Sequence, residues 1–263
     1  MNIEITKREI LVSVVIAILF VCLGIFIYGK ITDHLLSESE RYNTALKVKD
    51  KDTFDYVIDT QQGNIIVEAN IKAKDTVSFP ELKKDYLYIS KNKEEYTRHE
   101  ETYTDSKGKT HIRVYWSWDW MGNEARKSNK LEMFDKTYKT SQFTLFGPSS
   151  LDASAILNKT AKNSNWRKNH YYYVDGDTRY YYNAIPVSFD ASFIAKANDK
   201  GLSPIDDGST IYLKNTDIKG MLEDVENSGA FTKVVFWIVW LMLTAGIVFL
   251  YVSLENRYLE ERK

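Results

Sequence analysis

Two long apolar segments constrain this chain more than any other feature. Residues 10–28 read ILVSVVIAILFVCLGIFIY and residues 234–254 read VVFWIVWLMLTAGIVFLYVSL, and neither segment contains a charged side chain. A helix needs about 20 apolar residues to cross the hydrocarbon core of a bilayer. The core helix of a soluble domain rarely lacks charge over such a length. The sequence therefore predicts two transmembrane helices, over residues 10–29 and 234–254.

The first apolar segment also has to be compared with a cleaved signal peptide. Lys7 and Arg8 would suit the basic start of such a peptide, but no small-x-small cleavage site follows the apolar stretch. Cys22 could suggest a lipoprotein, yet Phe20 and Val21 are bulkier than the residues expected before a lipidated cysteine. We therefore expect an uncleaved anchor.

The short tails decide the expected orientation, because long loops cross the membrane largely regardless of their charge. Basic residues flank both spans on the tail side. We expect residues 1–9 and 255–263 to be cytoplasmic tails and residues 30–233 to form an extracytoplasmic domain. Lysine- and asparagine-rich usage with only four prolines is typical of an AT-rich bacterial or phage genome, so we expect a multi-pass protein of a bacterial cell membrane. The expected membrane-interface anchors are Trp237, Trp240, Tyr251, Lys7, Arg8 and Arg257.

The region between the spans has the pattern of a β-rich α+β domain. Short alternating runs separated by turn residues are typical of strands. We expect a helical stalk over residues 31–50 and further helices over 151–162 and 216–228. The expected strands cover residues 53–60, 64–73, 85–104, 110–120, 141–149, 184–199 and 208–215, and residues 171–182 form a tyrosine-rich hairpin.

Alternating tryptophans mark the strand over residues 110–120. Trp116, Trp118 and Trp120 share one face, and Val114 has the same parity. Such a face either fills a core or lies open as a platform for sugar rings or a peptide. We favour the core, because burying large aromatics would stabilise a sheet that has no disulfides. The same two interpretations apply to the tyrosine hairpin, where the candidate platform residues are Tyr171, Tyr173, Tyr180 and Tyr182.

Motifs for catalysis or metal binding are missing from the sequence. The four histidines have no metal-ligand spacing, and the single cysteine lies in the first apolar segment. The Asp-Gly turns at 175–177 and 206–208 do not follow the calcium-loop pattern. A net charge of −1 does not indicate a nucleic-acid partner. We expect no enzyme activity, no metal and no cofactor.

The carboxy-terminal part of the sequence resembles a known family. Residues 208–263 combine a Tyr-Leu strand, a short Leu-containing helix, an apolar span and a Tyr-, Glu- and Arg-containing tail, and they resemble the end of the GIDE/MULAN membrane domain. The matching positions are Tyr212, Leu213, Asp217, Met221, Leu222, Tyr258 and Leu259. The resemblance implies a membrane-adjacent domain for sensing or interaction. The cysteine-rich RING domain of that family is absent, because no cysteine follows position 22, so we expect no ubiquitin ligase activity.

These features together predict a non-enzymatic two-span membrane protein whose outer domain binds a ligand or partner, either another protein or a second copy. Small residues in the spans would permit close helix packing, namely Ser13, Ala17, Gly24, Thr244, Ala245 and Gly246. The alternative is an envelope carbohydrate-binding module or hydrolase that uses the aromatic strand as a platform.

Overall fold

The computed structural model describes residues 6–152, 155, 170–199, 201–205 and 209–260. Two long apolar helices flank a β-rich region, which agrees with the predicted mixture of helix and strand. The chain divides into a helical unit, made of residues up to Ala45 and from Lys219 onward, and a β-rich unit over Leu46–Ile218. The β-rich unit is shorter than the expected domain over residues 30–233, because both helices continue past their apolar segments.

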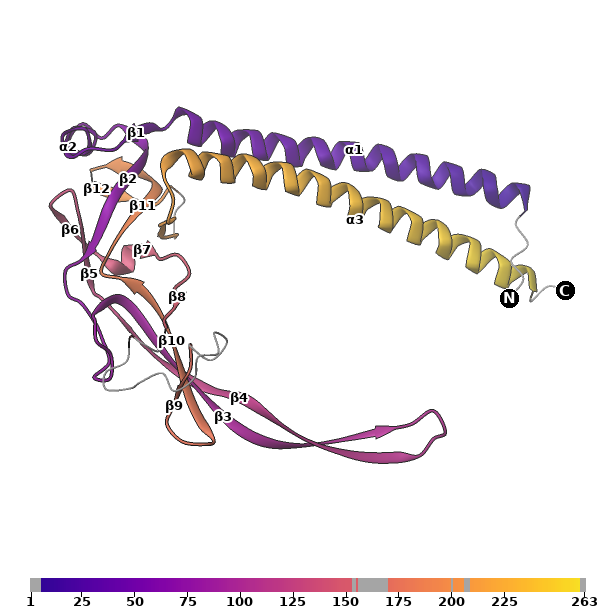
Figure 1. The fold of residues 1–263 in the computed structure, drawn as a ribbon. Coiled ribbons are helices and arrows are strands. Elements are labelled where there is room, and N and C mark those ends of the chain that lie inside the picture. The colour runs from indigo at the N-terminus through magenta and orange to yellow at the C-terminus, as the bar shows by residue number, and fades with distance from the viewer. Residues whose placement is uncertain (1–5, 153–154, 156–169, 200, 206–208, 261–263) are drawn as a thin grey trace. The chain divides into compact units, whose positions relative to one another are not determined.

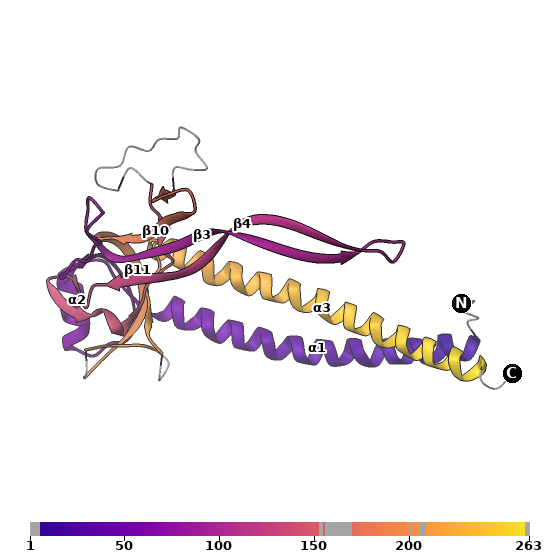
Figure 2. The same ribbon diagram turned by 90° about the horizontal axis from the view of Figure 1, so that it is seen from below.

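The helical unit consists of α1 (Lys7–Thr44) and α3 (Ile218–Glu260), which run side by side in opposite directions (Figure 1 and Figure 2). A capping box starts α1: the Glu9 amide donates to Thr6 Oγ1, and the Glu9 carboxylate accepts from the Thr6 amide. Both helices are long and apolar enough to cross a membrane, and only 6% of each apolar window is buried. An apolar surface this exposed is unlike the core helix of a soluble domain.

A close contact between Gly24 and Trp240 joins the two helices. The Trp240 indole lies against Gly24, and its Nε1 donates to the Phe20 carbonyl oxygen at 2.9 Å. Gly24 and Thr244 are buried in this helix pair, whereas Ala245 and Gly246 are exposed. Glycine is needed at position 24 because an added Cβ would lie 2.7 Å from Trp240 Cδ1.

The main sheet of the β-rich unit has the strand order β12-β11-β2-β5-β6, with β1 parallel to β2. Alternate residues of β2 and β11 point into one core, which includes Ile65, Val67, Ala191 and Phe193. The strands are β1 (Leu46–Val48), β2 (Gly63–Ala73), β5 (Lys130–Met133), β6 (Lys136–Lys139), β11 (Ser188–Asn198) and β12 (Gly201–Ser203).

The predicted strand over residues 53–60 is wrong, because this segment is the helix α2 (Lys51–Asp59). Asp50 caps it by accepting a hydrogen bond from the Thr53 amide at 2.8 Å. Phe54 and Val57, three residues apart, share the buried side of the helix and pack into the main core. The run TFDYVIDT also alternates in polarity, and that alternation suggested a strand.

The second sheet has the order β4-β3-β10-β8, with β9 also paired to β10. A smaller core lies on it and contains Phe79, Leu82, Tyr86, Ile89, Tyr182 and Ala184. The strands are β3 (Tyr86–Thr104), β4 (Thr110–Lys127), β8 (Ser149–Ser150), β9 (Tyr172–Tyr173) and β10 (Thr178–Pro186). The predicted pairing of residues 85–104 with 110–120 is confirmed, and so is the hairpin within residues 171–182.

Two further strand predictions were too long. Residues 141–149 are not one strand: the 3-10 turn η1 (Thr140–Gln142) is followed by the short strand β7 (Phe143–Thr144), and β8 begins at Ser149. Strand β7 pairs in parallel with β13 (Ile211–Tyr212), the strand within residues 208–215. The helix predicted over residues 151–162 lies almost wholly outside the described residues. The predicted helix over residues 31–50 is confirmed as far as Thr44, where α1 ends. The predicted helix over residues 216–228 is confirmed from Ile218, where α3 begins.

Candidate interaction surface

The β3–β4 hairpin continues beyond its sheet as a two-stranded ribbon (Figure 1 and Figure 2). Strand β10 pairs with β3 only as far as Glu95, so the two strands have no further sheet neighbour among the described residues beyond that point. Asp105 closes the end of the hairpin, because its Oδ1 accepts from the amides of Lys107 and Lys109 at 2.9 Å each. Gly108 allows the tight turn through its φ of +77°.

The register of the hairpin sorts its side chains onto two faces. Tyr96 lies opposite Trp118 and Arg98 lies opposite Trp116, so these residues share a face. We call this the tryptophan face, and define it as Glu94, Tyr96, Arg98, Ile112, Val114, Trp116, Trp118 and Trp120. The opposite face carries Thr97, His99, Tyr103, His111, Tyr115, Ser117 and Asp119.

The tryptophan face is exposed, so the expectation that it fills a core is wrong. Trp116 is 52% exposed and Trp120 is 59% exposed, and Val114 is exposed as well. Trp118 is half-buried. The alternation correctly predicted which side chains share a face, but no second layer packs against that face within the described residues.

Aromatic stacking across the two strands holds this face together. The Tyr96 ring lies between two indoles, with its centroid 5.5 Å from Trp116 and 5.2 Å from Trp118. Trp118 in turn meets the edge of Tyr173 at 5.8 Å. An isolated two-stranded ribbon is marginally stable in water, and cross-strand aromatic pairs each contribute about 0.2–1 kcal/mol. These stacked rings of Tyr96, Trp116, Trp118 and Tyr173, which we call the ladder, therefore stabilise a ribbon that otherwise has little support.

A half-buried ion pair anchors the base of the ladder. Arg179 Nη2 and Nε lie 2.5 Å and 2.6 Å from Glu94 Oε2, and the two side chains are only 14% and 15% exposed. The Arg179 guanidinium also lies over two rings, with its Cζ 4.2 Å from the centroid of Trp118 and 3.8 Å from that of Tyr171. The sequence reasoning missed Arg179 and Glu94. The sequence clue that could have identified Arg179 is its place within the tyrosine-rich hairpin, where a cation can stack on several rings.

The four candidate tyrosines divide between the two faces of the sheet. Tyr171 and Tyr173 lie on the tryptophan face, around Arg179. Tyr180 and Tyr182 lie on the other face, because they alternate with Arg179 along β10. The predicted platform therefore combines the three tryptophans with Tyr171 and Tyr173 only.

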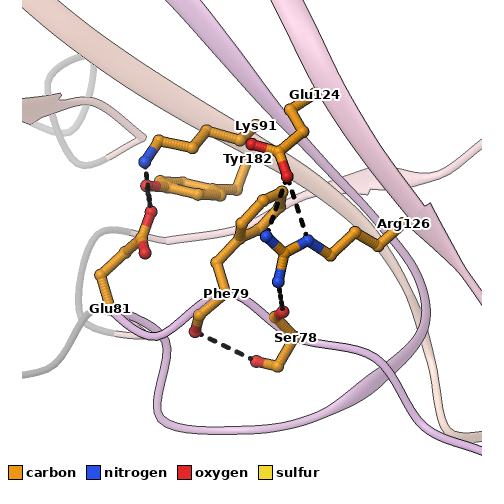
Figure 3. A network of polar contacts seen from close by, with 7 residues as sticks. All are labelled: Ser78, Phe79, Glu81, Lys91, Glu124, Arg126 and Tyr182. Atoms are coloured by element: carbon orange, nitrogen blue, oxygen red, sulfur yellow. Dashed lines mark hydrogen bonds and ion pairs between the residues drawn. The ribbon is translucent and has the colours of Figure 1, made fainter.

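Tyr182 belongs to a polar network rather than to an open platform (Figure 3). It is buried, and its hydroxyl donates to Glu81 Oε1 at 2.7 Å, which also accepts from Lys91 Nζ at 2.5 Å. Burial, together with the Glu81 carboxylate, raises the pKa of Tyr182. Burial alone would raise the pKa of Glu81, but the hydrogen bonds from Lys91 and Tyr182 outweigh it and lower that pKa. Nearby, Arg126 bridges Glu124 and the Ser78 carbonyl (Figure 3).

The opposite face of the ribbon carries two histidine–carboxylate pairs. His99 Nε2 lies 2.6 Å from Asp119 Oδ2, and His111 Nε2 lies 2.9 Å from Asp105 Oδ2. Ser117 donates to Asp119 at 2.7 Å. This order of groups differs from a Ser-His-Asp triad, in which the serine hydroxyl faces the histidine that takes its proton. Hydrogen bonds from Ser117 and His99 lower the pKa of Asp119. Thr97 Oγ1 lies 3.0 Å from His99 Nε2, the same nitrogen that faces Asp119, and it also contacts the Asp119 carboxylate. The hydroxyl and the carboxylate therefore share one imidazole nitrogen, and the set ties the two strands together.

The β-rich unit also contains a cavity of about 630 Å³ that is lined mostly by polar residues, but Lys49 and Glu68 form an ion pair in it at 2.8 Å, and Asn70 donates to Asp190 at 2.8 Å. Another cavity, of about 320 Å³, is lined largely by apolar side chains that include Phe143 and Ile185. Within the described residues, no group of three or more His, Cys, Asp or Glu side chains could hold a metal ion.

The predicted membrane anchors occupy the helical unit. Trp237 contacts Tyr28 of α1, with ring centroids 5.6 Å apart, and Trp240 fills the contact at Gly24. Arg8 Nη1 lies 3.9 Å from Glu255 Oε1. The ends of α1 and α3 nearest the chain termini therefore lie together. Lys7 and Arg257 lie near the same ends, and Tyr251 is half-buried on α3.

No family model, no curated protein and no solved structure matches the chain. Its function therefore has to be inferred from its own residues.

Proposed function

We propose that this chain is a membrane-anchored interaction protein, and that it binds a protein partner through the tryptophan face. In this proposal α1 and α3 span the membrane of a bacterial cell, both termini are cytoplasmic, and the β-rich unit lies outside. The exposed apolar surface of the two helices and the joint position of their terminal ends support two antiparallel spans. The likeness of residues 208–263 to the GIDE/MULAN membrane domain is consistent with a membrane-adjacent interaction domain.

One observation carries the assignment of the surface: two tryptophans are more than half exposed on a ribbon that is fixed in place. Large exposed aromatic patches on soluble domains usually mark binding sites, and Trp and Tyr are enriched at the centres of protein interfaces. Tyr96 holds the rings of Trp116 and Trp118, and Arg179, fixed by Glu94, holds Trp118 as well, before any partner arrives. Binding therefore loses little side-chain entropy.

A binding role fits the face better than hydrolysis does. Acid–base catalysis on a sugar needs two carboxyl groups that face the same bond. On the tryptophan face, Glu94 is held by Arg179, and Glu100 is held by Arg98 at 2.6 Å. Neither carboxylate is positioned as a general acid. Trp116 also stacks on Tyr96 and Trp118 is tilted against it, so these two indoles already pack on a ring of the protein itself.

Site-specific photo-crosslinking in the source membrane tests the proposal. A benzophenone amino acid replaces Trp120 in one full-length variant and Tyr56 in the control variant, since both residues are 59% exposed and both lie on the β-rich unit. We expect a discrete protein adduct from position 120 and none from position 56. Equal labelling at both positions, or binding of envelope polysaccharide without a protein adduct, would contradict a protein partner.

A further inference from the structure

The free edge of strand β4 is the feature that points to a particular partner. β4 pairs with β3 on one side, and no described strand pairs with its other side. A long exposed edge carrying apolar side chains is normally blunted by charges or covered by another chain. Here Ile112, Val114, Trp116 and Trp120 are all exposed along it. The outer edge of β4 can therefore accept a further strand through backbone hydrogen bonds.

Hydrogen-bond alternation fixes which residues offer their backbone to that edge. The Tyr96 amide donates to the Asp177 carbonyl at 2.8 Å, so its backbone groups point away from β4. Tyr96 lies opposite Trp118, and this pair is therefore a non-hydrogen-bonded pair of the hairpin. The amide and carbonyl of Trp118 face outward, and by the same alternation those of Trp116 and Val114 do as well.

From this arrangement we infer that β4 pairs with β4 of a second copy, antiparallel and centred on Trp116. The inference rests on the proposed function, since it names a protein that lies directly beside the tryptophan face, on the edge of the strand that carries the three tryptophans. A twofold axis through Trp116 places each residue opposite the one at the same distance on the other side. Trp116 then faces its own counterpart, Val114 faces Trp118, and Ile112 faces Trp120, so the tryptophan faces of the two copies join into one continuous apolar surface.

Charge complementarity selects this register. Centring on Trp116 places Arg113 of each copy opposite Asp119 of the other, on the opposite face of the ribbon. No ion pair within the described residues engages Arg113, whose Cζ lies 5.7 Å from the Tyr115 ring centroid. Centring on Tyr115 instead would place Arg113 opposite Ser117, and Trp120 opposite the polar Thr110. That register leaves Arg113 without a carboxylate from the other copy, and only Glu101 of its own hairpin lies opposite it.

The length of the paired segment also has a physical limit. The register of β3 and β4 shifts between Lys93 and Glu94, because β4 has one extra residue there, Met121, which forms a bulge. A bulge bends a strand and interrupts its pairing. Pairing centred on Trp116 uses residues 112–120 and ends just before the bulge in each copy. The bulge therefore confines the dimer contact to the ribbon.

Cysteine crosslinking of the full-length chain in membranes tests the register, in a Cys22→Ser background. Opposed residues in a hydrogen-bonded pair have Cα atoms about 5.5 Å apart, which suits a disulfide. We expect Trp116→Cys to form a disulfide dimer with itself. Val114→Cys and Trp118→Cys should each stay largely monomeric alone but should crosslink when the two variants are coexpressed. Stronger crosslinking of Tyr115→Cys than of Trp116→Cys, or equal yields at every position, would overturn the inference.

A charge exchange supplies the second measurement. Arg113→Glu alone and Asp119→Arg alone each place like charges across the twofold axis, and each should lower the Trp116→Cys dimer yield about fivefold. Coexpressed, the two variants restore both opposite-charge pairs, so a heterodimer should form at the original yield. Recovery in the mixture would support the register, because local misfolding of one variant is not rescued by a partner. Failure to recover, with both variants retaining the native tryptophan fluorescence, would contradict the register.

The outcomes separate the two proposals. If the cysteine variants remain monomeric while position 120 photo-crosslinks a different protein, the self-pairing is wrong and the interaction role stands. If neither experiment yields a protein adduct, the proposed function fails as well.

Discussion

Removal of the Arg179 side-chain charge should destabilise the β-rich unit far more than removal of an exposed cation. In Arg179→Met, Glu94 stays in a site where it is only 15% exposed and loses both hydrogen bonds from the guanidinium. Breaking such a pair from one side costs about 3–5 kcal/mol, because the remaining charge is left desolvated. The two cation–π contacts add about 1 kcal/mol.

This loss converts into a measurable shift in urea denaturation. Domains of this size have slopes of about 2 kcal/mol per molar urea, so a loss of about 4–6 kcal/mol lowers the unfolding midpoint by about 2–3 M. The assay is the intrinsic tryptophan fluorescence of the full-length protein in nanodiscs. Trp118 reports directly, since its ring contacts the guanidinium.

Matched variants make the result decisive. Lys51→Met removes a cation from an ion pair with Asp135 that is 50% and 76% exposed, and should cost at most about 0.5 kcal/mol. Glu94→Gln combined with Arg179→Met should be less harmful than the sum of the two single changes. If Arg179→Met shifts the midpoint no further than Lys51→Met does, the pair is not desolvated and does not anchor the ladder.

Three further predictions concern other parts of the molecule. Gly24→Ala introduces a methyl group against an indole of α3 and should lower the thermal stability of the helix pair by about 1–3 kcal/mol, whereas Gly246→Ala, with open space around it, should not. Hydrogen bonds from the turn before β5 overcome burial and lower the pKa of Asp75 to about 2, so its contribution is present above pH 4 and is lost as the pH falls toward 2; Asp75→Asn should flatten that part of the stability–pH curve. Val57→Ala should cost about 1–3 kcal/mol and Tyr56→Ala almost nothing, since only the helix α2 buries the first and exposes the second.

The elements predicted correctly are those whose local pattern has one physical solution. An uncharged apolar run of about 20 residues, near the thickness of a bilayer core, favours one continuous helix, and both predicted apolar helices are present. The β3–β4 hairpin followed from alternation on both sides of the turn DSKGK. By contrast, the segment TFDYVIDT carries both a strand-like alternation and a helical pair at Phe54 and Val57. The Asp50 cap favours the helix.

The site was only half predictable, for a different reason. Periodicity shows which side chains share a face, and it grouped Trp116, Trp118 and Trp120 correctly. Periodicity does not show what lies against that face, because this depends on tertiary contacts. The expectation of a core is wrong for that reason. The partnership of Glu94 with Arg179 joins residues far apart in the chain and arises only from the pairing of β3 with β10.

Hydroxyl-radical footprinting of the intact protein tests the central claim most directly. Oxidation of Trp116 and Trp120 is compared between native membranes and dilute purified protein in nanodiscs, with Tyr56 as the internal reference. If the tryptophan face is a binding surface, both tryptophans should be protected several-fold in native membranes while Tyr56 is unchanged. Equal oxidation of the two tryptophans in both preparations would contradict the account.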